Sequence, residues 1–182
     1  MYWRDVPYKT FKPSWIEDLP VSLINRYARF YNIDAVFLAA VVKIESGGNP
    51  NAMRFEPNYQ YTSMIRQLAD AIECSPATME VMQKTSWGLM QVMGSVAFEL
   101  GLAAEKDFNN RWPTSLLIPE RGMTYGCMHL KKKINAYGSD ADTVYAAYNA
   151  GSPRMTESGG FFVNQTHVNK FRQFYNELGG DA

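Results

Sequence analysis

Residues 34–48 read Asp34-Ala35-Val36-Phe37-Leu38-Ala39-Ala40-Val41-Val42-Lys43-Ile44-Glu45-Ser46-Gly47-Gly48. The run from Ala35 to Ile44 is so uniformly apolar that a helix formed from it must be buried on most sides. Asp34 is a residue type that caps a helix N-terminus, and the two glycines are typical of a tight turn. The stretch therefore predicts a core helix that ends in a carboxylic acid, Glu45.

The position of Glu45 favours acid chemistry. A carboxyl at the C-terminal end of a buried helix lies near the negative pole of the helix dipole and near low-dielectric surroundings, and both effects raise the pKa of a carboxyl. An acid that keeps its proton near neutral pH can protonate a leaving-group oxygen, which is the first requirement for cleaving a glycosidic bond. Glu45 is therefore the candidate general acid.

Outward from this helix, apolar residues recur with a helical period and alternating strand patterns are scarce, so the fold is expected to be mainly α. Proline, N-cap and glycine signals predict further helices over 20–32, after Ser75-Pro76, over 119–138, over 140–151 and over 168–179. The stretches 104–112 and 152–160 are expected to be loops. We expect one domain over residues 1–182.

Composition narrows the classes of partner. Lys plus Arg and Asp plus Glu number 18 each in 182 residues, so no strong field favours nucleic acid or an anionic membrane. The N-terminus lacks the apolar core of a secretory signal, and no run approaches the roughly 18 apolar residues of a membrane helix, so no stable membrane insertion is expected. Cys74 and Cys127 fit no disulfide framework or zinc motif and are expected to be reduced thiols.

Three separated motifs place polar side chains beside glycine in apolar surroundings. They are Glu45-Ser46, then Ser86-Trp87-Gly88-Leu89-Met90-Gln91, then Ala146-Ala147-Tyr148-Asn149-Ala150-Gly151. Glycine lets backbone approach a ligand closely, amides supply directed hydrogen bonds, and an aromatic face such as that of Tyr148 can stack on a pyranose ring. The mixture suits a sugar, with Gln91 and Asn149 reading hydroxyl or acetamido groups.

The order of these motifs resembles that of the soluble lytic transglycosylase family, relatives of goose-type lysozymes, over roughly residues 20–151. The resemblance implies a lysozyme-like helical fold, a peptidoglycan glycan strand as substrate, and Glu45 as the sole catalytic acid and base. It also implies that Gln91, Tyr148 and Asn149 line the glycan cleft, with Ser86 and Met90 as neighbours.

The chain departs from the family pattern in two places. In the pattern that runs from Pro119 to Leu130, the family's Asn falls at Gly122 and its Tyr at His129. The interval 53–85 is also longer than in many members, and we expect it to be a helical insertion beside the cleft. It contains a possible second carboxylate, Glu56, although a structural or solvent-facing role suits that residue better.

The resemblance implies a substrate-assisted reaction that forms 1,6-anhydromuramyl ends and needs no metal or cofactor. A muramidase that hydrolyses the same bond with Glu56 activating water is the first alternative. A non-catalytic glycan-binding module of a phage particle or secretion machine is the second. Without a secretory signal, the chain fits a phage lysin or virion enzyme, or a specialised bacterial cell-wall enzyme, and a monomer is expected.

The two histidines and a run of three lysines are expected to have no catalytic role. His129 and His167 have no spacing typical of a metal site or a nucleophilic relay, so each is expected to be a surface or hydrogen-bonded histidine. Lys131-Lys132-Lys133 is expected to be the solvated side of a helix.

Overall fold

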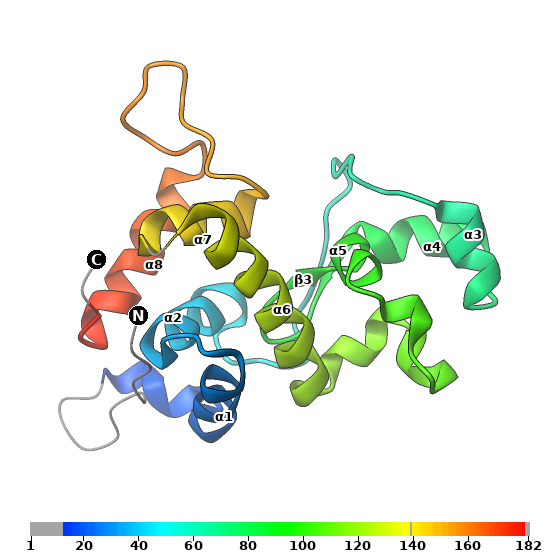
Figure 1. Ribbon diagram of the computed structural model, residues 1–182, viewed down its shortest axis with the longest axis horizontal. Helices are drawn as coiled ribbons and strands as arrows, with labels where there is room; N and C mark the ends of the chain where they lie inside the picture. The colour runs from blue at the N-terminus through cyan, green and yellow to red at the C-terminus, as the bar shows by residue number, and fades with distance from the viewer. Residues whose placement is uncertain (1–12, 139, 181–182) are drawn as a thin grey trace. The chain divides into compact units, whose positions relative to one another are not determined.

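The computed structural model describes residues 13–138 and 140–180. Their contacts group them into two compact units, unit 1 within residues 1–48 and 127–182 and unit 2 over Asn49–Gly126. Helix α6, Pro119–Tyr137, begins in unit 2 and ends in unit 1. Helices dominate both units (Figure 1), as the apolar periodicity predicts.

The regular elements of unit 1 are helices over its described residues, apart from one isolated bridge between Met155 and Phe162. Besides the end of α6 it contains the 3₁₀ turn Ser14–Asp18 and the helices α1, Val21–Tyr31; α2, Ala35–Ser46; α7, Ala141–Ala150; and α8, Gln165–Glu177. The predicted boundaries at Asn32 and Asp140 are confirmed: Asn32 is the left-handed C-cap of α1, and the Asp140 side chain accepts the Thr143 amide hydrogen.

Helix α2 is the buried core helix that the sequence predicts. Asp34 Oδ1 accepts the Phe37 amide hydrogen at 2.9 Å, and every residue from Ala35 to Val42 is buried. Gly47, with φ +65°, ends the helix, and a side chain at Gly48 would collide with the backbone carbonyl of Asp18. In the turn that follows Glu45, Gly47 thus adopts a left-handed backbone conformation, and Gly48 leaves room for a neighbouring carbonyl.

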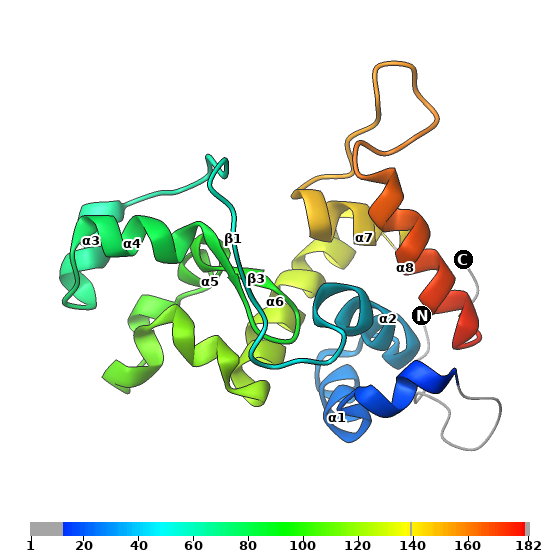
Figure 2. The ribbon, with the colours of Figure 1, turned by 180° about the vertical axis from the view of Figure 1, so that it is seen from behind.

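An aromatic cluster fixes α2 against α7 and α8. Phe171 of α8 packs against Phe37 of α2 with ring centroids 4.9 Å apart, and it stacks on Tyr145 of α7 at 4.5 Å. Tyr175 continues the stack along α8. Helices α2, α7 and α8 also lie together in the rear view (Figure 2). Each such ring pair contributes about 0.5–1.5 kcal/mol beyond area burial, so this cluster is a principal source of the rigidity of unit 1.

Unit 2 combines short helices with a small antiparallel sheet of order β1-β2-β3. Its elements are β1, Met53–Phe55; α3, Ile65–Ala71; α4, Pro76–Gln83; β2, Thr85–Trp87; β3, Val92–Met93; α5, Gly94–Glu99; and the 3₁₀ turns Leu102–Ala104, Phe108–Arg111 and Pro113–Leu117. Ser75 caps α4 as predicted, accepting the Thr78 amide hydrogen at 3.1 Å.

Two local expectations for unit 2 need correction. Residues 53–85 begin with a strand rather than a helix, because Met53 pairs with Trp87 and Phe55 with Thr85 across the sheet. Strands of two or three residues contain too few positions to show an alternating pattern, so the sequence could not reveal them. The stretch 104–112, expected to be a loop, also contains a 3₁₀ turn at Phe108–Arg111. Whether 53–85 is an insertion stays a prediction.

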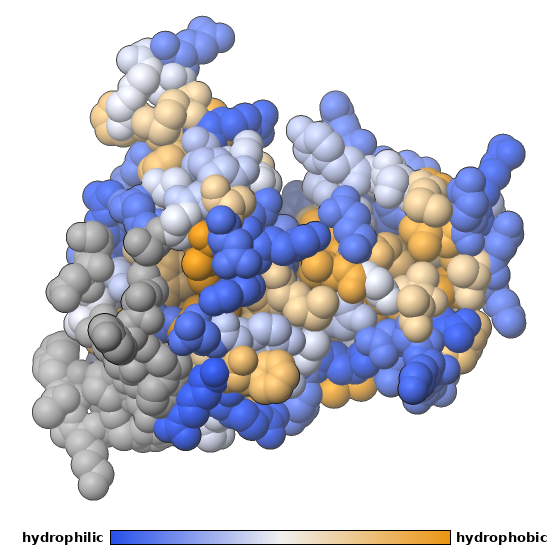
Figure 3. Space-filling model, viewed as in Figure 1, coloured by the Kyte–Doolittle hydropathy of each residue, from blue (hydrophilic) through white to orange (hydrophobic). Residues whose placement is uncertain are grey.

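The connection between α7 and α8 is a projecting loop, as expected for 152–160 (Figures 1 and 2). One antiparallel bridge joins Met155 to Phe162 at its base. Phe161 is 60% exposed and Val163 50% exposed, and the surface view shows apolar groups on this loop among hydrophilic neighbours (Figure 3). The loop therefore presents apolar side chains to solvent.

Two further observations concern the cysteines and membrane-spanning helices. Cys74 is a partly buried free thiol and Cys127 a buried one. Within the described ranges, no helix combines the length and apolar character needed to cross a bilayer.

Replacing Asp34 tests the cap of the core helix. We expect Asp34→Ala to lower the free energy of unfolding by about 1 kcal/mol, because an orphan amide at the start of α2 loses its acceptor. Asp34→Asn, which keeps a capping oxygen, should lose less. Urea unfolding followed by circular dichroism measures both, and equal stability of Asp34→Ala and the parent would contradict the cap's contribution.

Candidate active site

Glu45 lies in the last turn of α2 and is partly exposed. Tyr145 of α7 donates a hydrogen bond from its hydroxyl to Glu45 Oε1 at 3.0 Å. The Tyr145 ring is fully buried and stacked on Phe171, so its hydroxyl reaches Glu45 from a rigid base. The carboxyl is therefore oriented by the core and partly open to solvent, which is an arrangement suited to acid and base chemistry.

Tyr148 lies one turn further along α7 and is also buried. Burial first, then the neighbouring carboxyl of Glu45 and the thiol of Cys127, raise the pKa of Tyr148 well above its usual range. The phenol therefore keeps its proton at any physiological pH. The structure thus brings Tyr148 into the electrostatic neighbourhood of Glu45, two sites that are about a hundred residues apart in the chain.

The His129 ring of α6 packs against the Tyr148 ring. The two ring centroids are 5.1 Å apart with an interplanar angle of 54°. Burial, followed by the charges of Lys133 and Lys132, lowers the pKa of His129 to about 4, while a hydrogen bond with the Tyr148 backbone acts in the opposite direction. Of the two expected situations for this histidine, the hydrogen-bonded one is confirmed, and its imidazole is neutral at pH 7.

Asn149, the next predicted site residue, connects the end of α7 to the start of α8. Its side-chain oxygen accepts a hydrogen bond from Asn164 Nδ2 at 2.9 Å. Asn164 Nδ2 also contacts the Ala146 carbonyl at 3.3 Å. Asn149 is partly exposed, so it braces the helix junction, and its contact with a sugar stays a prediction.

The glutamine motif forms a β-hairpin in unit 2, in which β2 and β3 are joined by Gly88-Leu89-Met90-Gln91. Gln91 has φ +46°, and its Nε2 donates to the carbonyls of Ala52 and Gly88, each at 3.0 Å. Ser86 Oγ donates to Gln91 Oε1 at 2.9 Å. The Gln91 side-chain amide thus stabilises the hairpin. Its binding to the substrate stays a prediction.

The other two predicted neighbours in this hairpin are buried. Ser86 is 2% exposed, and Met90 is fully buried with its side chain against Gly126 of α6. Any Cβ at Gly126 would overlap the Met90 side chain, which gives this glycine of the family pattern a packing reason. The structure shows Ser86 and Met90 supporting the hairpin from within unit 2, and their contact with a glycan stays a prediction.

Glu56, the proposed second carboxylate, lies just after β1 in unit 2. Its Oε1 accepts a hydrogen bond from Arg54 Nε in an ion pair, and about a third of its side chain is exposed. A carboxylate paired with arginine at an exposed position is a common surface arrangement. This contact favours the structural or solvent-facing interpretation of Glu56.

Sequence reasoning missed Tyr145, although its hydroxyl donates a hydrogen bond to Glu45. A signal was present, because Tyr145 precedes Tyr148 by three residues and such pairs share one face of a helix. The sequence spacing of His129 indicates no metal site and gives no sign of its contact with Tyr148. Its match to the tyrosine position of the family pattern was the better clue.

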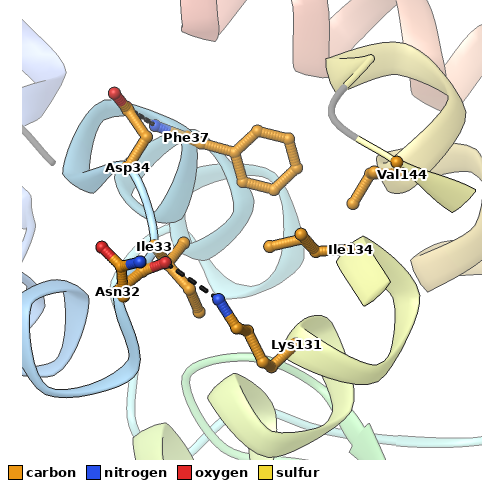
Figure 4. A pocket seen from close by; sticks show the side chains of 8 residues that line it. Asn32, Ile33, Asp34, Phe37, Lys131, Ile134 and Val144 are labelled. Atoms are coloured by element: carbon orange, nitrogen blue, oxygen red, sulfur yellow. Dashed lines mark hydrogen bonds between the residues drawn. The ribbon is translucent and has the colours of Figure 1, made fainter. Parts of the chain in front are cut away.

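A cavity of about 300 Å³ lies at the opposite end of α2 from Glu45 (Figure 4). Its lining residues are Asn32, Ile33, Asp34, Phe37, Lys131, Ile134, Gly138 and Val144. Lys131 donates a hydrogen bond from Nζ to the Asn32 carbonyl at 3.1 Å at the cavity wall, in an exposed position. Asp34 caps α2, so the cavity offers no carboxyl comparable with Glu45. In the part of the chain that the structure describes, no cluster of His, Cys, Asp and Glu could hold a metal ion.

The lowered pKa of the partly buried His129 predicts a pH-dependent stability. The folded pKa of about 4 lies below the ordinary value of 6.5, so between these values the unfolded chain binds a proton that the folded chain does not. Stability should therefore fall as pH falls from 6.5 to 4, by about 3 kcal/mol in total. Urea unfolding at pH 7, 5.5 and 4.5 measures this, and His129→Phe should lose that part of the pH dependence. An identical pH dependence in parent and variant would refute the assignment.

Comparison with known proteins gives two matches. The family described as "Transglycosylase SLT domain" matches residues 22–161. The endolysin of Enterobacteria phage PRD1 is 34% identical over 77 residues, which cover 35% of this chain and 52% of the endolysin. The chain thus aligns with about half the length of that relative. No solved structure gives a significant match.

Proposed function

Because the chain belongs to the transglycosylase SLT domain family, we propose that it cleaves peptidoglycan glycan strands as a lytic transglycosylase. The observation that carries the proposal is the Glu45 carboxyl, which accepts a hydrogen bond from the Tyr145 hydroxyl at the end of a buried helix. The similarity to a phage endolysin supports a role in breaking down the bacterial cell wall, as a lysin or a virion enzyme.

In the proposed reaction, protonated Glu45 donates its proton to the oxygen that links N-acetylmuramic acid to N-acetylglucosamine. The bond from that oxygen to the muramyl C1 breaks, and the acetamido oxygen stabilises the positive centre. The Glu45 carboxylate then removes the proton from the muramyl C6 hydroxyl, whose oxygen bonds to C1. The products are an anhydromuramyl end and a free N-acetylglucosamine hydroxyl, with Glu45 protonated again and no water consumed.

Two phenols of α7 act on Glu45. The Tyr145 hydroxyl donates to Oε1 and fixes the direction of the carboxyl, which is the positioning that proton transfer requires. Tyr148 supplies a second protonated phenol beside the acid. The proposed reaction needs only Glu45, its two tyrosine neighbours and the acetamido group of the substrate.

Glu45→Gln is the direct test of the acid. We expect turnover of purified peptidoglycan to fall at least a thousandfold, because an amide cannot deliver a proton to the leaving group. Binding to insoluble peptidoglycan in a pull-down should be largely retained. Mass spectrometry of the digest identifies the end groups of the products, and anhydromuramyl ends indicate transglycosylation. Full activity of the variant would reject the role of Glu45.

Glu56→Gln is the matched control, and it distinguishes the proposed transglycosylase from a hydrolytic muramidase. Its carboxylate pairs with Arg54, so we expect the variant to form anhydro products at close to the parent rate. If digests instead contain reducing muramic acid ends and Glu56→Gln abolishes them without unfolding, the protein is a two-acid muramidase. If neither variant nor parent cleaves glycan but all bind it, the protein is a glycan-binding module.

Tyr145→Phe tests the support of the acid. The ring and its stack on Phe171 remain, while the hydrogen bond to Glu45 is lost. Hydrogen bonds to charged groups are worth about 1.5–3 kcal/mol, so we expect kcat to fall roughly 10- to 100-fold. The thermal unfolding midpoint should change little. Phe171→Leu keeps the Tyr145 hydroxyl but removes the aromatic ring on which Tyr145 stacks. This variant should therefore lower both kcat and stability.

A further inference from the structure

His129 is a partly buried polar group that the proposed reaction does not use. It extends from α6 toward α7, where its ring meets the Tyr148 ring at a centroid distance of 5.1 Å. The imidazole also takes part in a hydrogen bond with the Tyr148 backbone. One side chain thus restrains both the ring and the main chain of the same tyrosine, which is more than packing alone requires.

The restrained tyrosine is the one whose position matters for the acid. Tyr148 is buried, and the Glu45 carboxyl acts electrostatically on its phenol. A tilted ring contact at this distance limits rotation of the Tyr148 side chain, because the partner rings occupy each other's free space. Loss of the imidazole would leave room for the phenol to move, and displacements of about 1 Å can cost a hundredfold in rate.

We propose that His129 is a positioning residue that holds the Tyr148 ring on the face of α7 from which the Tyr145 hydroxyl reaches Glu45. This inference rests on the proposed function, since it assigns a role at the same site. A neutral imidazole suits the task because it combines an aromatic face with one N–H donor and introduces no fixed charge next to the acid.

A double-mutant cycle tests whether His129 acts through the Tyr148 hydroxyl. We expect His129→Ala to lower kcat about tenfold and to change KM less than threefold. In a Tyr148→Phe background, where the hydroxyl is absent, the same substitution should change kcat less than twofold. His167→Ala, at the exposed histidine of α8, is the control and should leave kcat unchanged. Equal effects of His129→Ala in both backgrounds would overturn the proposal.

Two conservative variants separate the parts of the contact and replace His129→Ala if that variant does not fold. His129→Phe keeps the ring contact and loses the N–H, whereas His129→Gln keeps a donor and loses the ring. Positioning by both contacts predicts partial recovery of kcat, to within about threefold of the parent, in each. Loss of thermal stability without loss of kcat in both variants would show that His129 is merely structural.

An NMR readout makes the test independent of turnover. With ¹³C-labelled tyrosine rings, the Tyr148 resonance is assigned by its disappearance in Tyr148→Phe. We expect His129→Ala to shift and broaden this resonance as the ring gains freedom, and His167→Ala to leave it unchanged. An unmoved resonance in His129→Ala overturns the positioning role even if the protein is an active transglycosylase. An inactive parent whose Tyr148 resonance responds to His129→Ala overturns the proposed function but not the restraint on Tyr148.

Discussion

The hydrogen bond from the Tyr145 hydroxyl to Glu45 is the contact on which the site depends. It joins an acid at the end of a buried helix to a ring stacked on Phe171, which in turn packs against Phe37 near the start of that helix. The same rings therefore stabilise unit 1 and orient the acid. Because tightly packed aromatic cores yield little to small forces, the direction of the carboxyl is set before any ligand arrives.

Helix α7 supplies uncharged groups to this acid. Tyr145 and Tyr148 lie three residues apart on one helix face, and burial beside Glu45 keeps the Tyr148 phenol protonated. Burial likewise keeps His129 neutral behind Tyr148 at physiological pH. In the proposed reaction Glu45 first gives up a proton and later regains it, and a strong fixed charge nearby would favour one of these two states more than an uncharged neighbour does.

The hairpin in unit 2 shows how one motif can serve both structure and recognition. The Gln91 amide makes three hydrogen bonds to its own hairpin and to the preceding strand connection, while Met90 fills the space that Gly126 leaves open. Residue types and spacing signalled that this segment is important. They could not signal that its amide is occupied by backbone carbonyls, because those contacts depend on a turn and on strands too short to show a pattern.

The sequence by itself determined where several helices begin and end and indicated Glu45 as the candidate acid, since Asp34, Ser75, Asp140 and Gly47 act within a few residues of themselves. Local hydrogen bonds and the conformational freedom of glycine do not depend on the rest of the chain. Only the tertiary structure decided that Tyr145 holds Glu45 and that His129 lies against Tyr148. Those contacts arise where α2, α6 and α7 pack together, and long-range packing of this kind leaves no periodic trace in the sequence.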